Sequence, residues 1–180
     1  MWERAGIKGR PHFKALLYNE PARKLVAYFE RTADGKWPIG EIYTRSVDQQ
    51  VYGIVPGTSD LVSYERPVSA ADAPLIFFNE LRLRVDLPGS ADWGAVHCLD
   101  LTSGQLSTVV SAESIWIPEG CLRVSVSSVL SVDASGSRVF CRMAFEEGNE
   151  SVSRSGYWLC ELSVSDPVPR KITVLRKTFI

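Results

Sequence analysis

Two histidines, His12 and His97, are the only imidazole bases in the 180-residue chain. Nucleophilic catalysis needs a serine, threonine or cysteine beside such a base, and Cys98 follows His97 directly. We expect a β-strand here, in which neighbouring side chains point to opposite faces, so these two residues cannot form a local dyad. No G-x-S-x-G elbow occurs either. The sequence therefore predicts no catalytic residue, and it favours a hydrogen-bonded structural role for His97.

Glu146, Glu147, Asn149 and Glu150 could supply oxygen ligands of the kind that calcium binds. Their spacing does not match an EF-hand loop, and the polar stretch at 146–156, which contains two glycines, is expected to be a solvated loop. No G-x-G-x-x-G or G-K-[ST] sequence is present to hold a phosphate group. The sequence therefore predicts neither a metal nor a cofactor.

The four cysteines are spread along the second half of the chain, at Cys98, Cys121, Cys141 and Cys160. None forms a C-x-x-C pair and none has a histidine at ligand spacing, which argues against a zinc site. Cys141 and Cys160 fall on adjacent expected strands and could face each other. Buried free thiols are the favoured interpretation for the whole set.

Aromatic side chains form the most informative constellation. Trp37, Trp93 and the pair Tyr157 and Trp158 recur where a hairpin leads into the third strand of each of three repeats. Aromatic platforms at such a rim bind sugars by stacking or proteins by burial. We therefore predict a binding role for these four residues. The alternative is that each ring packs between adjacent repeats as part of the core.

Three stretches of the chain, roughly 13–55, 63–110 and 127–178, repeat one pattern of short strands and turns. Each expected strand is rich in β-branched or aromatic residues and is bounded by Gly, Pro, Asp, Asn or Ser. The strands of the third repeat are expected at 129–132, 138–145, 157–164 and 171–178. Those of the first are expected at 15–18, 24–30, 41–47 and 51–55, and those of the second include 74–78, 93–101 and 105–110.

Aligning the repeats brings apolar residues into corresponding places. In the second strand the corresponding residues are predicted to be Leu25, Leu75 and Val139. In the third strand they are predicted to be Val47, Leu101 and Val164. The repeat period drifts only through its loops, where insertions are tolerated.

The runs V-D-A-S-G-S-R-V-F at 132–140 and C-L-D-L-T-S-G-Q-L at 98–106 carry a resemblance to a known architecture. They are similar to the "PDG" and "D-x-x-T-G" turns of TolB-like and WD40-like β-propeller blades. The resemblance implies four-stranded antiparallel blades over most of the chain. The first repeat departs from the pattern, because 19–22 and 47–50 lack glycine, and no G-H…W-D pair is present.

Three blades do not close a propeller, since known propellers use about four to eight. An open arc would leave strand edges free at both ends. Two chains could complete a six-bladed ring as a homodimer. Alternatively, the strands form a single β-barrel or sandwich, or the chain is a piece of a longer protein. The expected fold class is all-β throughout, with residues 1–180 forming one domain.

Composition excludes some classes of partner. The net charge is −1, the pI is about 6.1, and no run of Lys and Arg exceeds two residues. A nucleic-acid or anionic-membrane binder needs a basic stripe, so neither partner is expected. The N-terminus has no apolar core of the signal-peptide type and no stretch is long enough to span a bilayer, so a cytoplasmic location is expected.

Three functional hypotheses follow from these observations. The first is a non-enzymatic binding or scaffold module with a protein or carbohydrate ligand. The second is a small-ligand carrier built as a closed, lipocalin-like barrel. The G-K-W sequence that ends at Trp37 matches the lipocalin G-x-W motif, although here two expected strands precede it. The third is an enzyme whose site is assembled from scattered loops.

Overall fold

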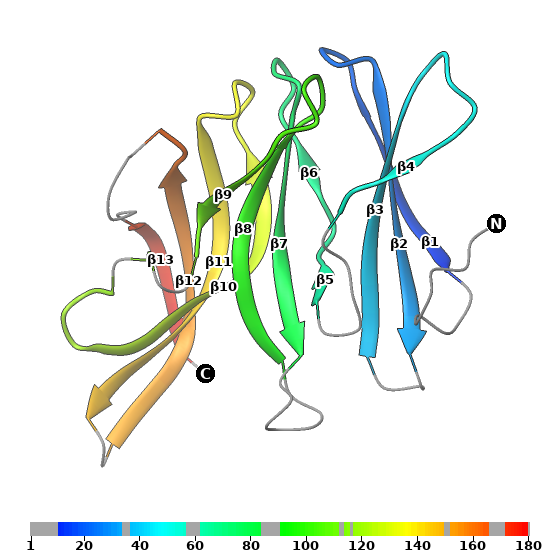
Figure 1. Cartoon of the computed structure of the whole chain (residues 1–180). Coiled ribbons are helices and arrows are strands. Elements are labelled where there is room, and N and C mark those ends of the chain that lie inside the picture. The colour runs from blue at the N-terminus through cyan, green and yellow to red at the C-terminus, as the bar shows by residue number, and fades with distance from the viewer. Residues whose placement is uncertain are drawn as a thin grey trace.

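The computed structural model describes residues 11–33, 37–56, 62–83, 91–111, 114–115, 117–149, 152–165 and 172–179 (Figure 1). All regular secondary structure in these ranges is β, as the sequence predicts. They contain no helix long and apolar enough to cross a membrane.

The strands form three antiparallel sheets, which lie side by side in chain order (Figure 1). The first has the order β1 (His12–Asn19), β2 (Lys24–Ala33), β3 (Trp37–Ser46), β4 (Gly53–Ile54). The second contains β5 (Val62–Tyr64), β6 (Val68–Ser69), β7 (Leu75–Leu83), β8 (Ala91–Asp100) and β9 (Leu106–Val110). The third has the order β10 (Cys121–Val132), β11 (Arg138–Asn149), β12 (Val152–Ser163), β13 (Ile172–Phe179).

The second sheet matches the other two once β5 and β6 are taken together. Both pair with the same edge of β7, β5 with its C-terminal half and β6 with its N-terminal half. They therefore occupy the place of one first strand, interrupted between Tyr64 and Val68. Pro67 lies in the interruption, where its missing N–H costs no ladder hydrogen bond.

One backbone hydrogen bond recurs in all three sheets. The residue after the third strand donates its N–H to the carbonyl of the residue before the second strand. The donor and acceptor pairs are Val47 and Arg23 at 3.1 Å, Leu101 and Pro74 at 2.7 Å, and Val164 and Ser137 at 2.8 Å. This repetition confirms the predicted correspondence of the third strands.

The predicted correspondence of the second strands is wrong by one residue at Leu75. Leu75 is the first residue of β7 and lies opposite Asp100, as Lys24 lies opposite Ser46 in the first sheet. The residue that corresponds to Leu25 and Val139 is therefore Ile76. Leu75 and Ile76 are both apolar, so residue type alone could not show which of them corresponds to Leu25 and Val139.

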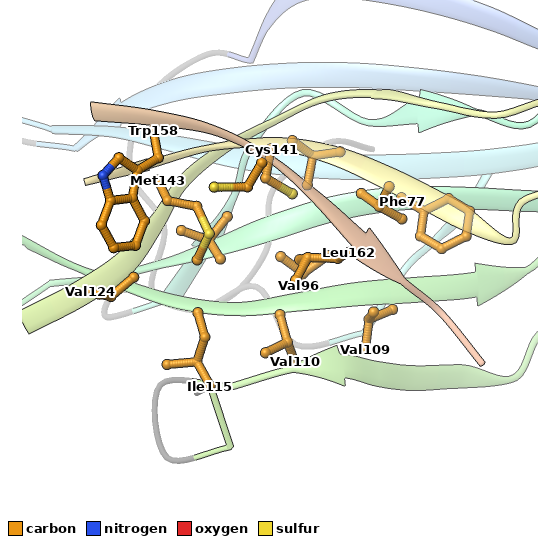
Figure 2. Close-up of a cluster of buried hydrophobic side chains, with 14 of the residues drawn as sticks. Phe77, Val96, Val109, Val110, Ile115, Val124, Cys141, Met143, Trp158 and Leu162 are labelled. Atoms are coloured by element: carbon orange, nitrogen blue, oxygen red, sulfur yellow. The ribbon is translucent and has the colours of Figure 1, made fainter. Parts of the chain in front are cut away.

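The sheets pack face to face around two cores, and the central sheet contributes to both. Phe77 points toward the third sheet, whereas Ile76 and Phe78 point toward the first. Figure 2 shows the core between the second and third sheets, where Phe77 and Val96 meet side chains of β11 and β12 such as Cys141 and Leu162. Because both faces of β7 are covered, four consecutive residues of this strand, Ile76 to Asn79, are fully buried.

The loop predicted at 146–156 is wrong. β11 continues to Asn149 and β12 begins at Val152, with Glu146 opposite Ser155 and Glu147 opposite Arg154. Backbone pairing needs no apolar side chains, so an exposed hairpin can be polar throughout. Gly148, with φ of 130°, lies near the end of β11 in this hairpin.

The alternative of a single barrel or sandwich is also wrong. The described strands form three separate sheets that close no barrel. The closed cavity that a lipocalin-like carrier requires is therefore not formed by these strands.

The described cysteines are free thiols, as the sequence favours. Cys141 and Cys160 lie directly opposite each other on β11 and β12, and both are fully buried. Burial raises the pKa of each thiol to about 12, so both remain protonated and unreactive at neutral pH.

Candidate functional site

The four aromatic residues predicted to bind a ligand all lie in third strands. Trp37 begins β3 opposite Ala33, and Trp93 lies in β8 opposite Leu81. The side chains of both tryptophans lie outside the part of the chain that the structure describes. Tyr157 is in the middle of β12 rather than at its start, because that strand begins five residues earlier than predicted.

Tyr157 and Trp158 point to opposite faces of the third sheet. The Trp158 side chain is 3% exposed and stacks on Phe145, with ring centroids 4.8 Å apart. Figure 2 places it in the core beside Met143. Trp158 thus occupies the core position that the sequence left open as the alternative for these aromatics. The binding role of the four residues stays a prediction.

Tyr157 is 37% exposed and lies on the face of the third sheet that points away from the second. The guanidinium of Arg142 lies 5.0 Å from its ring centroid, within cation–π range. Arg142 Nε also donates a hydrogen bond to Ser127 Oγ at 3.0 Å. These two contacts hold the arginine head against the sheet surface.

A shallow groove of about 200 Å³ surrounds this pair, and we call it the C-terminal groove. It is lined by Leu130, Arg142, Tyr157, Trp158, Leu159, Arg176 and Thr178. Apolar side chains therefore lie beside two guanidiniums. Such a surface can cover an apolar side chain while donating hydrogen bonds to carboxylate or carbonyl oxygens.

In the first and second sheets, the face that corresponds to this groove is covered by the next sheet in the chain. We call the face of each sheet that points toward the next sheet in the chain its forward face. Counting from the first residue of each second strand, Tyr28, Asn79 and Arg142 occupy corresponding places on the three forward faces. Tyr28 and Asn79 are buried by the following sheet, whereas Arg142 is exposed. The C-terminal groove is thus the forward face that no described strand covers.

His97 has the hydrogen-bonded position expected of a structural histidine. Its Nε2 lies 3.0 Å from Glu80 Oε2, and its Nδ1 lies 3.4 Å from Thr108 Oγ1. The hydrogen bond from His97 and the Arg82 guanidinium lower the pKa of Glu80, against the effect of its burial. Cys98 points to the opposite face of β8 and packs in the core between the second and third sheets. The predicted separation of His97 and Cys98 is therefore confirmed.

Of the residues considered as calcium ligands, Glu147 is engaged by neighbouring strands, and Glu150 lies outside the described residues. Glu147 forms an ion pair with Lys177 on β13, and the Cys121 thiol lies 3.9 Å from the same carboxylate. Across the described ranges, no group of three or more His, Cys, Asp or Glu residues gathers to hold a metal ion.

Sequence reasoning identified Tyr157 but missed Arg142, Leu159 and Arg176. Alternation along β12 places Leu159 on the same face as Tyr157, and that signal was present in the sequence. Arg142 and Arg176 could be placed only once the register of β11 and β13 against β12 was known. No protein-family model matches the chain, and neither the curated proteins nor the solved structures include a match.

Proposed function

We propose that this chain is a non-enzymatic binding and scaffold module that docks an extended or β-sheet segment of a protein on its C-terminal groove. The observation that carries the proposal is the uncovered forward face of the third sheet. The corresponding faces of the first two sheets are each covered by another sheet. Because the third sheet has the same antiparallel arrangement, its forward face is suited to bind another β-strand or sheet.

The side chains of the groove support a protein ligand. Leu130 is 48% exposed, and Tyr157 and Leu159 are each 37% exposed. Grouped exposed apolar side chains are characteristic of interaction sites, and Tyr and Arg are enriched among the residues that dominate binding energy. Carbohydrate binding by stacked platforms is less favoured, because the indole of Trp158 is buried.

The arrangement of the sheets supports a propeller-like architecture for the module. Each sheet consists of a few antiparallel strands in chain order. Consecutive sheets pack face to face. Propeller blades pack in this manner, but about four to eight are needed for closure. Closure of such an arc would therefore need sheets beyond the three described.

A peptide selection tests the docking function directly. Random linear peptides displayed on phage are selected on the wild-type protein and counter-selected on Leu159→Asp. We expect peptides that combine apolar side chains with a carboxylate, because the groove offers both leucines and guanidiniums. Their affinity should fall at least tenfold in Leu159→Asp and in Arg176→Ser.

Arg154→Ser is the matched control for Arg176→Ser, because Arg154 is exposed on β12 but does not line the groove. It should leave peptide affinity unchanged. Failure to select any peptide that distinguishes wild type from Leu159→Asp, on protein that light scattering shows to be monomeric, would overturn the proposal. Equal losses in Arg154→Ser and Arg176→Ser would do so as well, since they would indicate nonspecific charge attraction.

A further inference from the structure

We infer that the partner of the C-terminal groove is a second copy of this chain, which docks the outer face of its first sheet there. This inference rests on the proposed docking function and names its partner. It follows from how the forward faces inside one chain hold the sheet that comes next.

The forward-face residues at corresponding places make corresponding contacts. Tyr28 Oη donates a hydrogen bond to the backbone carbonyl of Tyr64, 3.2 Å away on β5. Asn79 Oδ1 accepts one from the backbone N–H of Val129, 3.3 Å away on β10. In both cases a polar side-chain tip bonds the backbone of the first strand in the following sheet.

Arg142 occupies the third of these places, at the groove. A guanidinium has five N–H donors and no acceptor, so its counterparts on an incoming strand are carbonyl oxygens. The first strand of a following sheet would supply them. In a second copy that strand is β1, which lies at the edge of its sheet in the described strand order. Edge strands present backbone carbonyls to partners.

The first sheet has an outer face that fits this role. Its inner face carries Val26, Tyr28 and Ile42 against the central sheet, so alternation places Leu25, Ala27 and Phe29 on the outer face. In the second and third sheets the corresponding face packs on the preceding sheet. Within the described strands, no sheet packs on the outer face of the first sheet.

Exposed apolar side chains of β1 extend this outer face. Phe13 is 59% exposed and forms an edge-to-face contact with Phe29, at 5.7 Å between ring centroids. Leu16 and Tyr18, which lie opposite Ala27 and Leu25, are about half exposed. The exposed patch lies along the β1 edge of the sheet, since Ala27, Arg31 and Glu41 on the same face of β2 and β3 are buried.

The two open faces differ, so the contact between copies is head-to-tail. A head-to-tail contact closes when a two-fold axis makes the second contact identical to the first. Each copy then uses its groove once and its first sheet once. Two copies of three sheets would give a closed ring of six, within the range known for propellers.

Light scattering behind a sizing column tests this geometry with two disruptive variants. Wild-type protein should have twice the 20.0 kDa chain mass, and the mass should persist on dilution to micromolar concentrations. Leu159→Asp removes the groove and Leu16→Asp removes the first-sheet patch, so each variant alone should be monomeric. Ile117→Asp changes an equally exposed apolar residue between β9 and β10 and should remain dimeric.

Mixing the two disruptive variants separates a head-to-tail ring from other dimers. In the mixed dimer both substitutions fall in one contact and the other contact is intact, so dimers should reappear in the mixture. Their reappearance also demonstrates that both variants fold. Arg142→Ala should weaken dimerisation about a hundredfold, because one charge-assisted hydrogen bond is lost at each of the two contacts.

A wild-type monomer at every concentration would overturn the second-copy inference. A Leu16→Asp variant that remains dimeric would overturn it too, because the first sheet would then not be the partner face. Both outcomes are distinct from failure of the docking function. Peptides that require Leu159 would still establish the groove as a binding site for another protein.

Discussion

Arg31 Nε donates a hydrogen bond to Glu41 Oε2 at 2.9 Å, and neither side chain is more than 1% exposed. The two residues lie on β2 and β3, and Tyr43 Oη donates to the same carboxylate oxygen at 2.9 Å. Among the described residues, Glu41 Oε1 has no hydrogen-bond partner. A buried ion pair of this kind is costly to desolvate, and its two charges depend on each other.

Removing one member of this pair should destabilise the protein strongly. Glu41→Gln leaves the Arg31 charge buried without a counter-charge, so we expect a loss of about 3–5 kcal/mol in the free energy of unfolding. The double variant Arg31→Met, Glu41→Leu should be more stable than Glu41→Gln, because no charge is then buried. Urea unfolding gives the free energy of unfolding of the wild type, Glu41→Gln and the double variant.

The surface pair Lys14 and Glu30, at 3.1 Å, is the matched control for the buried pair. Lys14→Met should change stability by less than about 1 kcal/mol, as exposed pairs do. If the losses of the two single replacements, Arg31→Met and Glu41→Leu, simply add in the double variant, the two buried charges are not coupled.

Asn19 should be essential for joining the first sheet to the second. Its side-chain Nδ2 donates to Ser69 Oγ at 3.0 Å and to the Ala73 carbonyl at 2.9 Å, which links the end of β1 to β6 and to the turn before β7. Asn19→Ala leaves these acceptors without their donor, so we expect a loss of about 2–3 kcal/mol in thermal or denaturant unfolding. Asn19→Asp should cost more, since a carboxylate would face the carbonyl.

The exposed Gln49→Ala is the control for Asn19, and it should be neutral. A neutral Asn19→Ala would show that the two sheets are joined by their apolar core alone.

Glu80 should contribute a pH-dependent part of the stability. Its pKa is lowered in the fold by the hydrogen bond from His97 and then by Arg82, despite burial. A lowered carboxyl pKa stabilises the fold at pH values above the unfolded pKa of 4.5, and this contribution disappears as pH falls through the folded value. Glu80→Gln should therefore lose stability at pH 7 and show a flatter acid limb than wild type.

Unfolding of both proteins between pH 7 and pH 3 measures this difference. The stability gap between wild type and Glu80→Gln should narrow as the pH falls below 4.5. A gap that stays constant over this range would mean that the ionisation of Glu80 is not linked to folding.

The features that depend on local chemistry could be predicted from the sequence. The 133–136 turn is an example, because Asp133 Oδ1 accepts a hydrogen bond from the Arg138 N–H at 2.9 Å and Gly136 has φ of 78°. Both features need only residues a few positions apart. The repeats, the all-β class and the correspondence of the third strands could be predicted for the same reason.

The features that depend on packing between sheets could not. Ile76, Phe77 and Phe78 are all fully buried, because the central sheet is covered on both faces. A strand that is buried on both faces has no alternation of apolar and polar residues to show which side chains share a face. The alignment error at Leu75 follows from this. Arg142 is similar, since its exposure depends on the third sheet having no described neighbour on its forward face.

Tyr157 and Trp158 offer the sharpest comparison, because they are adjacent in sequence and face opposite ways. Trp158→Ala should cost about 3–5 kcal/mol of stability, since its ring fills the core against Phe145 and Met143. Trp158→Phe should cost much less, because its indole Nε1 has no hydrogen-bond partner in the described part of the chain. Chemical unfolding measures both variants.

Tyr157→Ala should show the reverse pattern. Its ring covers the groove rather than the core, so unfolding of the monomer should change by less than about 1 kcal/mol. Binding of the selected peptides should weaken at least tenfold, since the aromatic surface and its cation–π contact with Arg142 are lost. If Tyr157→Ala instead destabilises the fold as much as Trp158→Ala, this face of the third sheet is part of the structural core and not a docking surface.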